Sequence, residues 1–370
     1  MLRGQRLAAG AMVNPGRVST DFGDIPTVGI EEEFLLVDRG TGEPVAKNTA
    51  VAAQAAKNGV ELDMELTSCQ VETTTDILET REQMLHALTR MRRITAEAAE
   101  SAGATLLAVA LPPTVPHEFP ITDKPRYRHI AEEFGMIAHE QGISGCHVHV
   151  AVPDQDAAVA ACTRLRSWLP MLMALSANSA IYRNTDTGYA SWRHILWHRW
   201  PSAGPPPVLE SAAEYKNTVA QMQDAGAILD DGMVYWDARP SAKFPTVEVR
   251  ASDVCSTAAE AVFLATMIRG AVMTALHQPE RTPPISDHEL RATYWRAARD
   301  GIEGRMPPLL TAFVEQLRPA LEAAGDYEYA TAELERILHD GNGAMRQRRA
   351  WRRSGDIDDV LTEAASATIR

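Results

Sequence analysis

Three short stretches of the sequence combine ionisable side chains with the apolar residues of a buried strand. They are GIEEEFLLVD (29–38), GCHVHVAVPD (145–154) and PTVEVRASDV (245–254). Side chains two residues apart on a strand point to the same face of a sheet. Each stretch therefore presents a polar pair on one face: Glu31 with Glu33, His147 with His149, and Glu248 with Arg250.

Carboxylates inside apolar strands need a neutralising partner, because burial of an unpaired charge is very costly. If the three strands are neighbours, their polar pairs converge on one sheet face, and Glu72 adds a further carboxylate. Carboxylate oxygens are hard ligands that suit Mg²⁺ or Mn²⁺, and a single imidazole is compatible with them. Arg250, two residues after Glu248, would suit a phosphate oxygen rather than the metal.

Each stretch also has a simpler structural interpretation. Glutamates at a strand edge are often solvated, HVH can contain a structural histidine, and EVR can form a cross-strand ion pair. Glu32 points away from its two neighbours, and we expect it to be exposed or salt-bridged and spare for function. The metal-site hypothesis therefore depends on the joint occurrence of the three stretches.

Helical and strand-like segments alternate along the chain without a fixed repeat. Strands or extended segments are expected at residues 28–37, 61–75, 104–113, 145–154 and 245–254. Helices are expected at residues 76–101, 126–141, 157–179 and 257–277 and over most of the remaining C-terminal part. Asp76 is the expected N-cap of the first helix, and Pro170 is expected to kink or break the third. No low-complexity linker is visible, so we predict one α+β domain over residues 21–370 after a disordered leader at residues 1–20.

Bulk composition limits the classes of function. The chain has 36 Lys and Arg against 49 Asp and Glu, a net charge of −13, which argues against a nucleic-acid-binding surface. No apolar run approaches the roughly 18 residues of a membrane span, so we expect no membrane partner. The four cysteines form no CxxC pair and are expected to be reduced and buried. We expect a cytoplasmic protein that acts on small molecules and forms a homo-oligomer, such as a dimer.

Taken together, these stretches resemble the glutamate–cysteine ligase type 2 family, also called the carboxylate–amine ligases. The resemblance covers about residues 27–368, with the motifs in the family's order. Further matching stretches are ELTSCQVET (65–73), YRNTDTGYASWR (182–193), RWPSAGPPP (199–207), WDARPS (236–241) and GNGAMRQRRAWR (341–352). The resemblance implies a glutamine-synthetase-like α+β domain, in which a curved, mostly antiparallel sheet forms an active-site funnel with helices packed outside.

The resemblance also implies roles for single residues. Arg250 and Arg183 match arginines that contact the transferred phosphate, and so are expected to act in catalysis and in ATP binding. Arg126 or Arg128 matches a further arginine of the cofactor and substrate site, and the spacing leaves the choice open. Glu65 matches an acidic position that faces the amine substrate. The implied ligands for Mg²⁺, or alternatively Mn²⁺, are Glu31, Glu33, Glu72, His147 and Glu248.

The implied reaction is ATP-dependent amide formation, with glutamate and cysteine as the family's substrates. ATP would phosphorylate a carboxylate to an acyl phosphate, and an amine would then displace phosphate. The chain contains neither GxxxxGK[ST] nor GxGxxG, which agrees with a family that binds ATP on its sheet. One alternative is a metal-dependent hydrolase, in which HVH and the acids bind zinc and activate water. Another is a binding protein whose basic run at residues 346–353 contacts a partner.

Overall fold

The computed structural model of the chain describes residues 22–115, 119–140, 142–277 and 285–370. The leader expected at residues 1–20 lies outside the described residues. In chain order the elements are β1 (Val28–Asp38), α1 (Asn48–Ala56), β2 (Leu62–Met64), β3 (Gln70–Thr74), α2 (Arg81–Ser101), β4 (Ala104–Leu107), α3 (Pro125–Phe134), α4 (Met136–His139), β5 (Gly145–Ala151), α5 (Gln155–Leu165), α6 (Leu169–Ser176), β6 (Ile181–Tyr182), β7 (Thr185–Asp186), α7 (Trp192–Trp197), α8 (Ala212–Asp224), a 3₁₀ turn (Asp231–Met233), β8 (Ala238–Pro240), β9 (Thr246–Asp253), α9 (Ala258–His277), α10 (Asp287–Asp300), α11 (Met306–Ala323), α12 (Tyr327–Asp340), α13 (Gly343–Ser354) and α14 (Ile357–Thr368).

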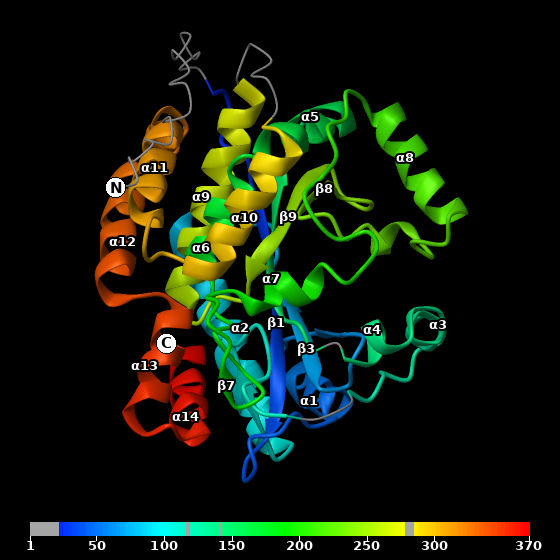
Figure 1. Cartoon of the computed structure of the whole chain (residues 1–370), viewed down its shortest axis with the longest axis vertical. Helices are drawn as coiled ribbons and strands as arrows, with labels where there is room; N and C mark the ends of the chain where they lie inside the picture. Colours follow the sequence, from blue (N-terminus) through cyan, green and yellow to red (C-terminus); the bar gives the residue numbers. More distant parts are fainter. Residues whose placement is uncertain (1–21, 116–118, 141, 278–284) are drawn as a thin grey trace, which may run out of the picture.

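The strands of the described residues form a seven-stranded sheet and a separate two-stranded hairpin of β6 and β7. The sheet has the order β2-β3-β1-β5-β9-β8, and β4 pairs with the far end of β1. Every strand pair in it is antiparallel. Helices pack against the sheet from outside (Figure 1). The predicted α+β fold with a mostly antiparallel sheet is confirmed.

The alternation of side chains along β1 decides what each face of the sheet is made of. Ile30, Phe34 and Leu36 are buried on the face covered by α2, α6 and α9. Glu31 and Glu33 point to the opposite face. Further along that opposite face, Leu35 and Val37 pack with residues of α14. The ionisable part of this face is therefore closed off at one end by an apolar cluster.

Helix α9 is long and apolar enough to span a membrane, but 89% of its apolar window is buried inside the protein. Figure 1 shows it in the middle of the helical layer, between the sheet and α11 and α12. Such burial is what a core helix of a globular protein requires.

Three helices differ from the sequence-based expectation, and the one expected at residues 126–141 is two helices, α3 and α4, divided at Gly135. Helix α2 begins at Arg81 and not near Asp76, because Thr80 and Gln83 form a reciprocal capping box at its start. The expected helix at residues 157–179 is two helices, α5 and α6, and Pro170 lies in the first turn of α6. Proline suits the first turn because its missing N–H would have had no partner there.

Residues 192–200 contain three tryptophans and belong to a loop-rich part of the chain. Trp197 and Trp200 are buried and pack around Tyr235, with ring centroids at 4.8 and 5.3 Å. They belong to an apolar cluster that joins α3, α7 and α8. In Figure 1, α3 and α8 lie at the right, away from the main helical layer. These two rings therefore help to hold the loop-rich stretch on the body of the protein.

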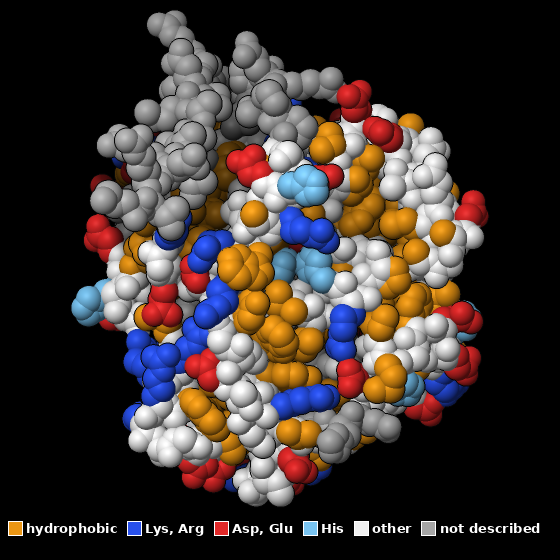
Figure 2. Space-filling model, viewed as in Figure 1, with side chains coloured by type: hydrophobic (Ala, Val, Ile, Leu, Met, Phe, Trp, Pro, Cys, Tyr) orange, Lys and Arg blue, Asp and Glu red, His pale blue; other side chains and the backbone are white. Residues whose placement is uncertain are grey.

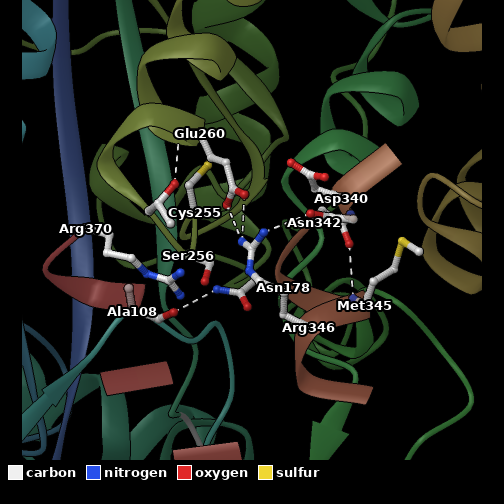
Figure 3. A network of polar contacts seen from close by, with 12 residues as sticks. Ala108, Asn178, Cys255, Ser256, Glu260, Asp340, Asn342, Met345, Arg346 and Arg370 are labelled. Atoms are coloured by element: carbon white, nitrogen blue, oxygen red, sulfur yellow. Dashed lines mark hydrogen bonds and ion pairs between the residues drawn. The ribbon is translucent and has the colours of Figure 1, made fainter. Parts of the chain in front are cut away.

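The C-terminal helices are fastened by buried polar contacts (Figure 3). Arg346 of α13 donates to both carboxylate oxygens of Glu260 at 2.7 Å, and Asn342 donates to the carbonyl of Ala174. The basic run at residues 346–353 is thus divided, with Arg346 engaged inwards and Arg352 and Arg353 exposed. Figure 2 shows basic side chains gathered over α13 at the lower left.

Candidate active site

The sheet brings the polar residues of five strands onto one face. Strand β1 lies between β3 and β5, and β5 lies between β1 and β9. The cross-strand pairs on this face are Glu33 with Glu72, Glu31 with His147, His149 with Glu248, and Arg239 with Glu248. Strand adjacency, which the sequence left open, therefore does place these residues together.

A β-bulge sets the position of Arg250. The register between β5 and β9 shifts between Cys146 and Val148, so that Arg250 and Ala251 together oppose His147. An extra residue of this kind bends a strand and redirects its side chains. The Nη1 atom of Arg250 lies 3.3 Å from Nδ1 of His147 and also donates to the Glu248 carboxylate.

One group of candidate ligands lies at the β5–β9 side of the site. Glu31 is within 3.3 Å of both His147 and His149. Its carboxylate, a ring nitrogen of His149 and the carboxylate of Glu248 lie within 4.8 Å of one another. Arg239 of β8 forms an ion pair with Glu248, and its Nε lies 2.8 Å from Oε2 of the carboxylate. Such a spacing is compatible with ligation of one divalent cation.

A second group lies at the β3 side and consists of carboxylates. Oxygens of Glu33, Glu65 and Glu72 lie within 4.8 Å of one another. Burial and the charge of Glu65 raise the pKa of Glu33 to about 8, and burial with the charges of the other acids raises the pKa of Glu72 well above its usual value. Like charges in such proximity are unfavourable unless protons or cations neutralise them. A hard divalent cation fits this donor set.

On the β5–β9 side, the pKa values of the carboxylates are lowered instead of raised. Burial would raise the pKa of Glu31, but hydrogen bonds and charge from His147 and His149 outweigh burial and hold it well below its usual range. Arg250 and Arg239 likewise overcome burial and keep the pKa of Glu248 low. Burial and Arg250 lower the pKa of His147 to about 4, which leaves its ring neutral and able to donate a lone pair.

Gly145, at the start of β5, is required by close packing around the site. A Cβ at this position would lie 2.7 Å from Nη2 of Arg193 and 2.9 Å from Nε2 of His147. Its backbone N–H donates to Oε2 of Glu33 at 2.6 Å. The glycine thus lets one strand carry a ligand histidine and leave room for an arginine beside it.

Two buried arginines have donor groups without a partner in the site. Within the described residues, Nε of Arg250 and Nε of Arg193 form no hydrogen bond. Both guanidinium groups act on the Glu33 carboxylate by charge. Arg193 is 2% exposed and lies over the Trp197 ring at 5.6 Å. An anionic ligand would satisfy these two donors.

The other predicted arginines lie outside this cluster. Arg183 occupies the tip of the β6–β7 hairpin at φ 50° and lies 3.6 Å from Glu140. Arg126 is half exposed and forms a bidentate pair with Asp230, and Arg128 pairs with Asp123 at the surface. Among the described residues, the contacts of these three side chains do not include the carboxylate ligands. Their assignment to phosphate or cofactor stays a prediction.

Three residues of the site were not among the ligands or phosphate-binding arginines expected from the sequence. His149 shares the face of His147 by simple alternation, which was sufficient to add it to the ligand set. Glu65 was noted as a substrate-facing acid, whereas it lies within the second carboxylate group. Arg193 follows a loop and begins α7, so its position depends on tertiary contacts that no local pattern reveals.

Comparisons with known proteins agree with this geometry. Residues 27–363 match the model of glutamate-cysteine ligase family 2. A relative from Mycolicibacterium vanbaalenii that is provisionally named glutamate–cysteine ligase 2-2 is 59% identical over 94% of this chain and 99% of its own length. A relative from Mycolicibacterium smegmatis, provisionally named glutamate–cysteine ligase 2-3, is 58% identical over 93% of this chain and 98% of its own.

Solved structures show the same fold at low sequence identity. A glutamate–cysteine ligase from Francisella tularensis, in complex with AMP, is 14% identical with a TM-score of 0.69 over 94% of this chain and 89% of that one. A bifunctional glutathione synthetase from Pasteurella multocida also has a TM-score of 0.69 at 14% identity, over 92% of this chain and 52% of that one. With the match over residues 27–363 and relatives of nearly equal length, the chain belongs to glutamate-cysteine ligase family 2.

Proposed function

We propose that this carboxylate–amine ligase uses ATP and Mg²⁺ to activate a carboxylate as an acyl phosphate, and then transfers the acyl group to an amine. The observation that carries the proposal is the convergence of five carboxylates and two histidines with the buried donors of Arg193 and Arg250 on one sheet face. Acids close to guanidinium groups whose Nε atoms have no partner fit cations and phosphate together.

The candidate ligands form overlapping groups that would divide the cations between them. Glu31, His149 and Glu248 would hold one cation, and Glu33, Glu65 and Glu72 another. A third group, of Glu31, Glu72 and His147, shares one residue with each of these two. Mg²⁺ fits these ligands better than a softer metal, because most of the donors are carboxylate oxygens. Bound cations would supply charge neutralisation for the ATP phosphates.

The arginines would act on the transferred phosphoryl group. A phosphoryl-transfer transition state spreads negative charge over its oxygens, and fixed cationic donors stabilise that charge. Arg250 is held by Glu248, which fixes the direction of its guanidinium group. Arg193 approaches from α7 and would complete the set, with Arg183 of the hairpin as a further candidate.

Amide formation then needs an amine close to the acyl phosphate and little water. Carbonyl attack by the amine breaks the bond to phosphate, and the nitrogen gives up a proton. The cluster of Trp197, Trp200 and Tyr235 lies beside Arg193 and would help to exclude water. The names of the relatives favour glutamate as the carboxylate and cysteine as the amine. Action in the cytoplasm as a homo-oligomer stays a prediction from the sequence.

The proposal is tested by ADP release from the purified full-length chain with Mg²⁺, ATP, glutamate and cysteine, and by mass detection of the amide. Glu31→Gln is expected to lower the rate at least about 100-fold, because the change removes a carboxylate that contacts both His147 and His149 and would bind the cation. The matched control is Glu97→Gln on the exposed surface of α2, which should retain full activity.

Absence of ADP with every amino-acid pair, together with a Glu31→Gln variant that behaves like the unmodified chain, would contradict the proposal. The hydrolase alternative makes a different prediction. It requires turnover of an amide or ester without ATP and a bound transition metal. Assays with ATP omitted therefore separate the two.

A further inference from the structure

Asp253, the last residue of β9, is a fully buried acid at the end of the candidate active site. In the register between β5 and β9 it pairs with Gly145. Residues directly opposite each other on neighbouring strands have their side chains on the same face. A Cβ at Gly145 would meet Arg193 and His147, so this face also holds the candidate ligands. The acid is therefore close to the site, although it belongs to none of the ligand groups.

The carboxylate of Asp253 holds the loop that leads into α7. It accepts hydrogen bonds from Asn178 N at 2.8 Å, from Ser179 Oγ at 2.8 Å and from Ser191 Oγ at 2.9 Å. A serine hydroxyl that donates its proton to an acid can still accept a hydrogen bond. Ser179 Oγ accepts from Arg193 N at 3.0 Å, and Ser191 Oγ caps the first turn of α7. The acid thereby fixes the backbone at Arg193.

The guanidinium group of Arg193 has few restraints of its own. Among the described residues it forms no ion pair, and its Nε has no hydrogen-bond partner. Its Nη2 donates to the carbonyl of Arg250 at 3.4 Å, which is long for a hydrogen bond. Burial raises the pKa of Asp253, and the charge of Arg193 is the largest of the effects that lower it. The two groups act on each other by charge, while the backbone at Arg193 decides where the guanidinium group lies.

We propose that Asp253 is a positioning residue, which holds Arg193 in place for the transferred phosphoryl group through Ser179 and Ser191. This inference rests on the proposed function. A carboxylate bonded directly to the guanidinium group would neutralise its charge and occupy its donors. Asp253 binds the loop instead, and leaves Nε of Arg193 available to an anionic ligand.

The test compares kinetics and stability in the full-length protein, with ADP release measured over a range of ATP concentrations. Asp253→Asn is expected to lower kcat at least about tenfold, because an amide offers one acceptor oxygen to three donors and Arg193 would shift. KM for ATP should change less than about twofold, because Arg193 would act on charge that develops in the transition state. Ser179→Ala, which breaks the link between the acid and Arg193 N, should give a smaller loss of kcat with the same pattern.

Asp326→Asn is the matched control. Asp326 is also a buried acid, and its ion pairs with Arg81 and Arg269 join α12 to α2 and α9. None of these three residues belongs to the ligand groups. Asp326→Asn should therefore lower the thermal stability and leave kcat of the folded protein unchanged. All assays are made below the temperature at which any variant begins to unfold.

A double-mutant cycle shows whether Asp253 acts through Arg193. Arg193→Ala removes the group that Asp253 would position, so Asp253→Asn should lower kcat no further in that background. Two independent effects on kcat would multiply instead.

Each outcome decides the inference. A lower kcat in Asp253→Asn, with KM for ATP retained and no further loss beside Arg193→Ala, supports it. An unchanged kcat in folded Asp253→Asn overturns it and leaves the proposed function intact, and so do losses that multiply in the cycle. If Asp253→Asn does not fold, Ser179→Ala decides, and an unchanged kcat there overturns the inference. If the unmodified chain releases no ADP with any amino-acid pair, the proposed function and this inference both fail.

Discussion

At the scale of single residues, three adjacent glutamates have different roles because a strand alternates its side chains. Glu31 and Glu33 face the candidate ligand groups, while Glu32 points to the helices. Glu32 is fully buried and forms a bidentate pair with Arg92 of α2 at 2.6 and 2.9 Å. Arg92 is also buried and donates to the carbonyls of Cys255, Ser256 and Thr368. Glu32 is therefore salt-bridged, as one expectation held, but it is not spare for stability.

We predict that Glu32→Gln destabilises the protein and leaves the ligand groups intact. The change leaves the Arg92 charge buried without a counterion, a situation that costs about 3–5 kcal/mol. Urea unfolding gives the free energy, and Mg²⁺ titration of the folded variant gives the metal affinity. Glu97→Gln removes an exposed pair with Arg93 and should cost under about 1 kcal/mol. A variant as stable as the unmodified chain would show that the buried pair contributes no net stability.

The division among these glutamates shows what local sequence can and cannot predict. A period of two separates Glu32 from Glu31 and Glu33 without any structure. The partner of Glu32 lies 60 positions away on α2, and nothing in the local pattern identifies it. His149 was available from the same alternation, whereas Arg193 was not, because its position depends on contacts of Ser179 and Ser191 with Asp253 at the end of β9.

At the scale of elements, the start of β5 and the start of α7 fit together around Gly145. Arg193 N donates to Ser179 Oγ, which donates to the buried carboxylate of Asp253 at the end of β9. Ser191 Oγ also donates to Asp253 and caps α7. The strand, the loop and the helix are thus locked in one arrangement, and Gly145 is the point of closest approach.

Gly145→Ala is expected to impair the site more than the fold. The added methyl group requires Arg193 or His147 to move, because both lie under 3.0 Å from its position. We expect at least a tenfold lower kcat/KM, since misplacement of a catalytic group by about 1 Å costs up to about 100-fold. Steady-state kinetics and thermal unfolding measured together check this. Gly226→Ala, where the structure has open space but φ is +72°, measures the effect of backbone strain without a steric clash. Unaltered kinetics in Gly145→Ala would contradict the tight packing.

Element types and strand alternation were predictable from periodicity, but strand order was not. The sequence predicts each polar strand separately, and the site exists only because β1 lies between β3 and β5. The bulge that positions Arg250 has no sequence signature such as a glycine, because the extra residues are Arg250 and Ala251. The resemblance to a known family supplied the adjacency that physical reasoning about the strands left open.

At the scale of the whole molecule, the raised pKa values of the carboxylates on the β3 side favour bound protons, which cations would replace. The raised pKa values of Glu33, Glu65 and Glu72 mean that the folded protein binds more protons than the unfolded chain between about pH 4.5 and pH 8. Stability of the metal-free protein therefore falls as the pH rises through this window. The lowered pKa of His147, about 4, has the opposite effect, but only below its unfolded value near 6.5.

We predict that the metal-free protein loses thermal stability between pH 6.5 and pH 8, and that Mg²⁺ restores more stability at pH 8 than at pH 6.5. Each pKa unit corresponds to about 1.4 kcal/mol of differential stability. Thermal unfolding in EDTA and in Mg²⁺ at both pH values gives the comparison. Glu72→Gln should flatten the pH dependence, because one of the coupled acids no longer titrates. A metal-free protein that is more stable at pH 8 than at pH 6.5 would contradict the presence of protonated carboxylates in the site.

The contact between Arg92 and the Thr368 carbonyl joins residues 276 positions apart in the chain. Thr368 also accepts, through its hydroxyl group, the backbone N–H of Ala108 beyond β4. During synthesis, the first strand and α2 leave the ribosome long before α14 exists. The emerging chain therefore lacks the contacts from Thr368 to this glutamate–arginine pair until that residue has been translated. Folding around β1 is completed only after synthesis has passed Thr368, so the nascent chain is the stage at which the protein is most exposed to aggregation and to chaperones.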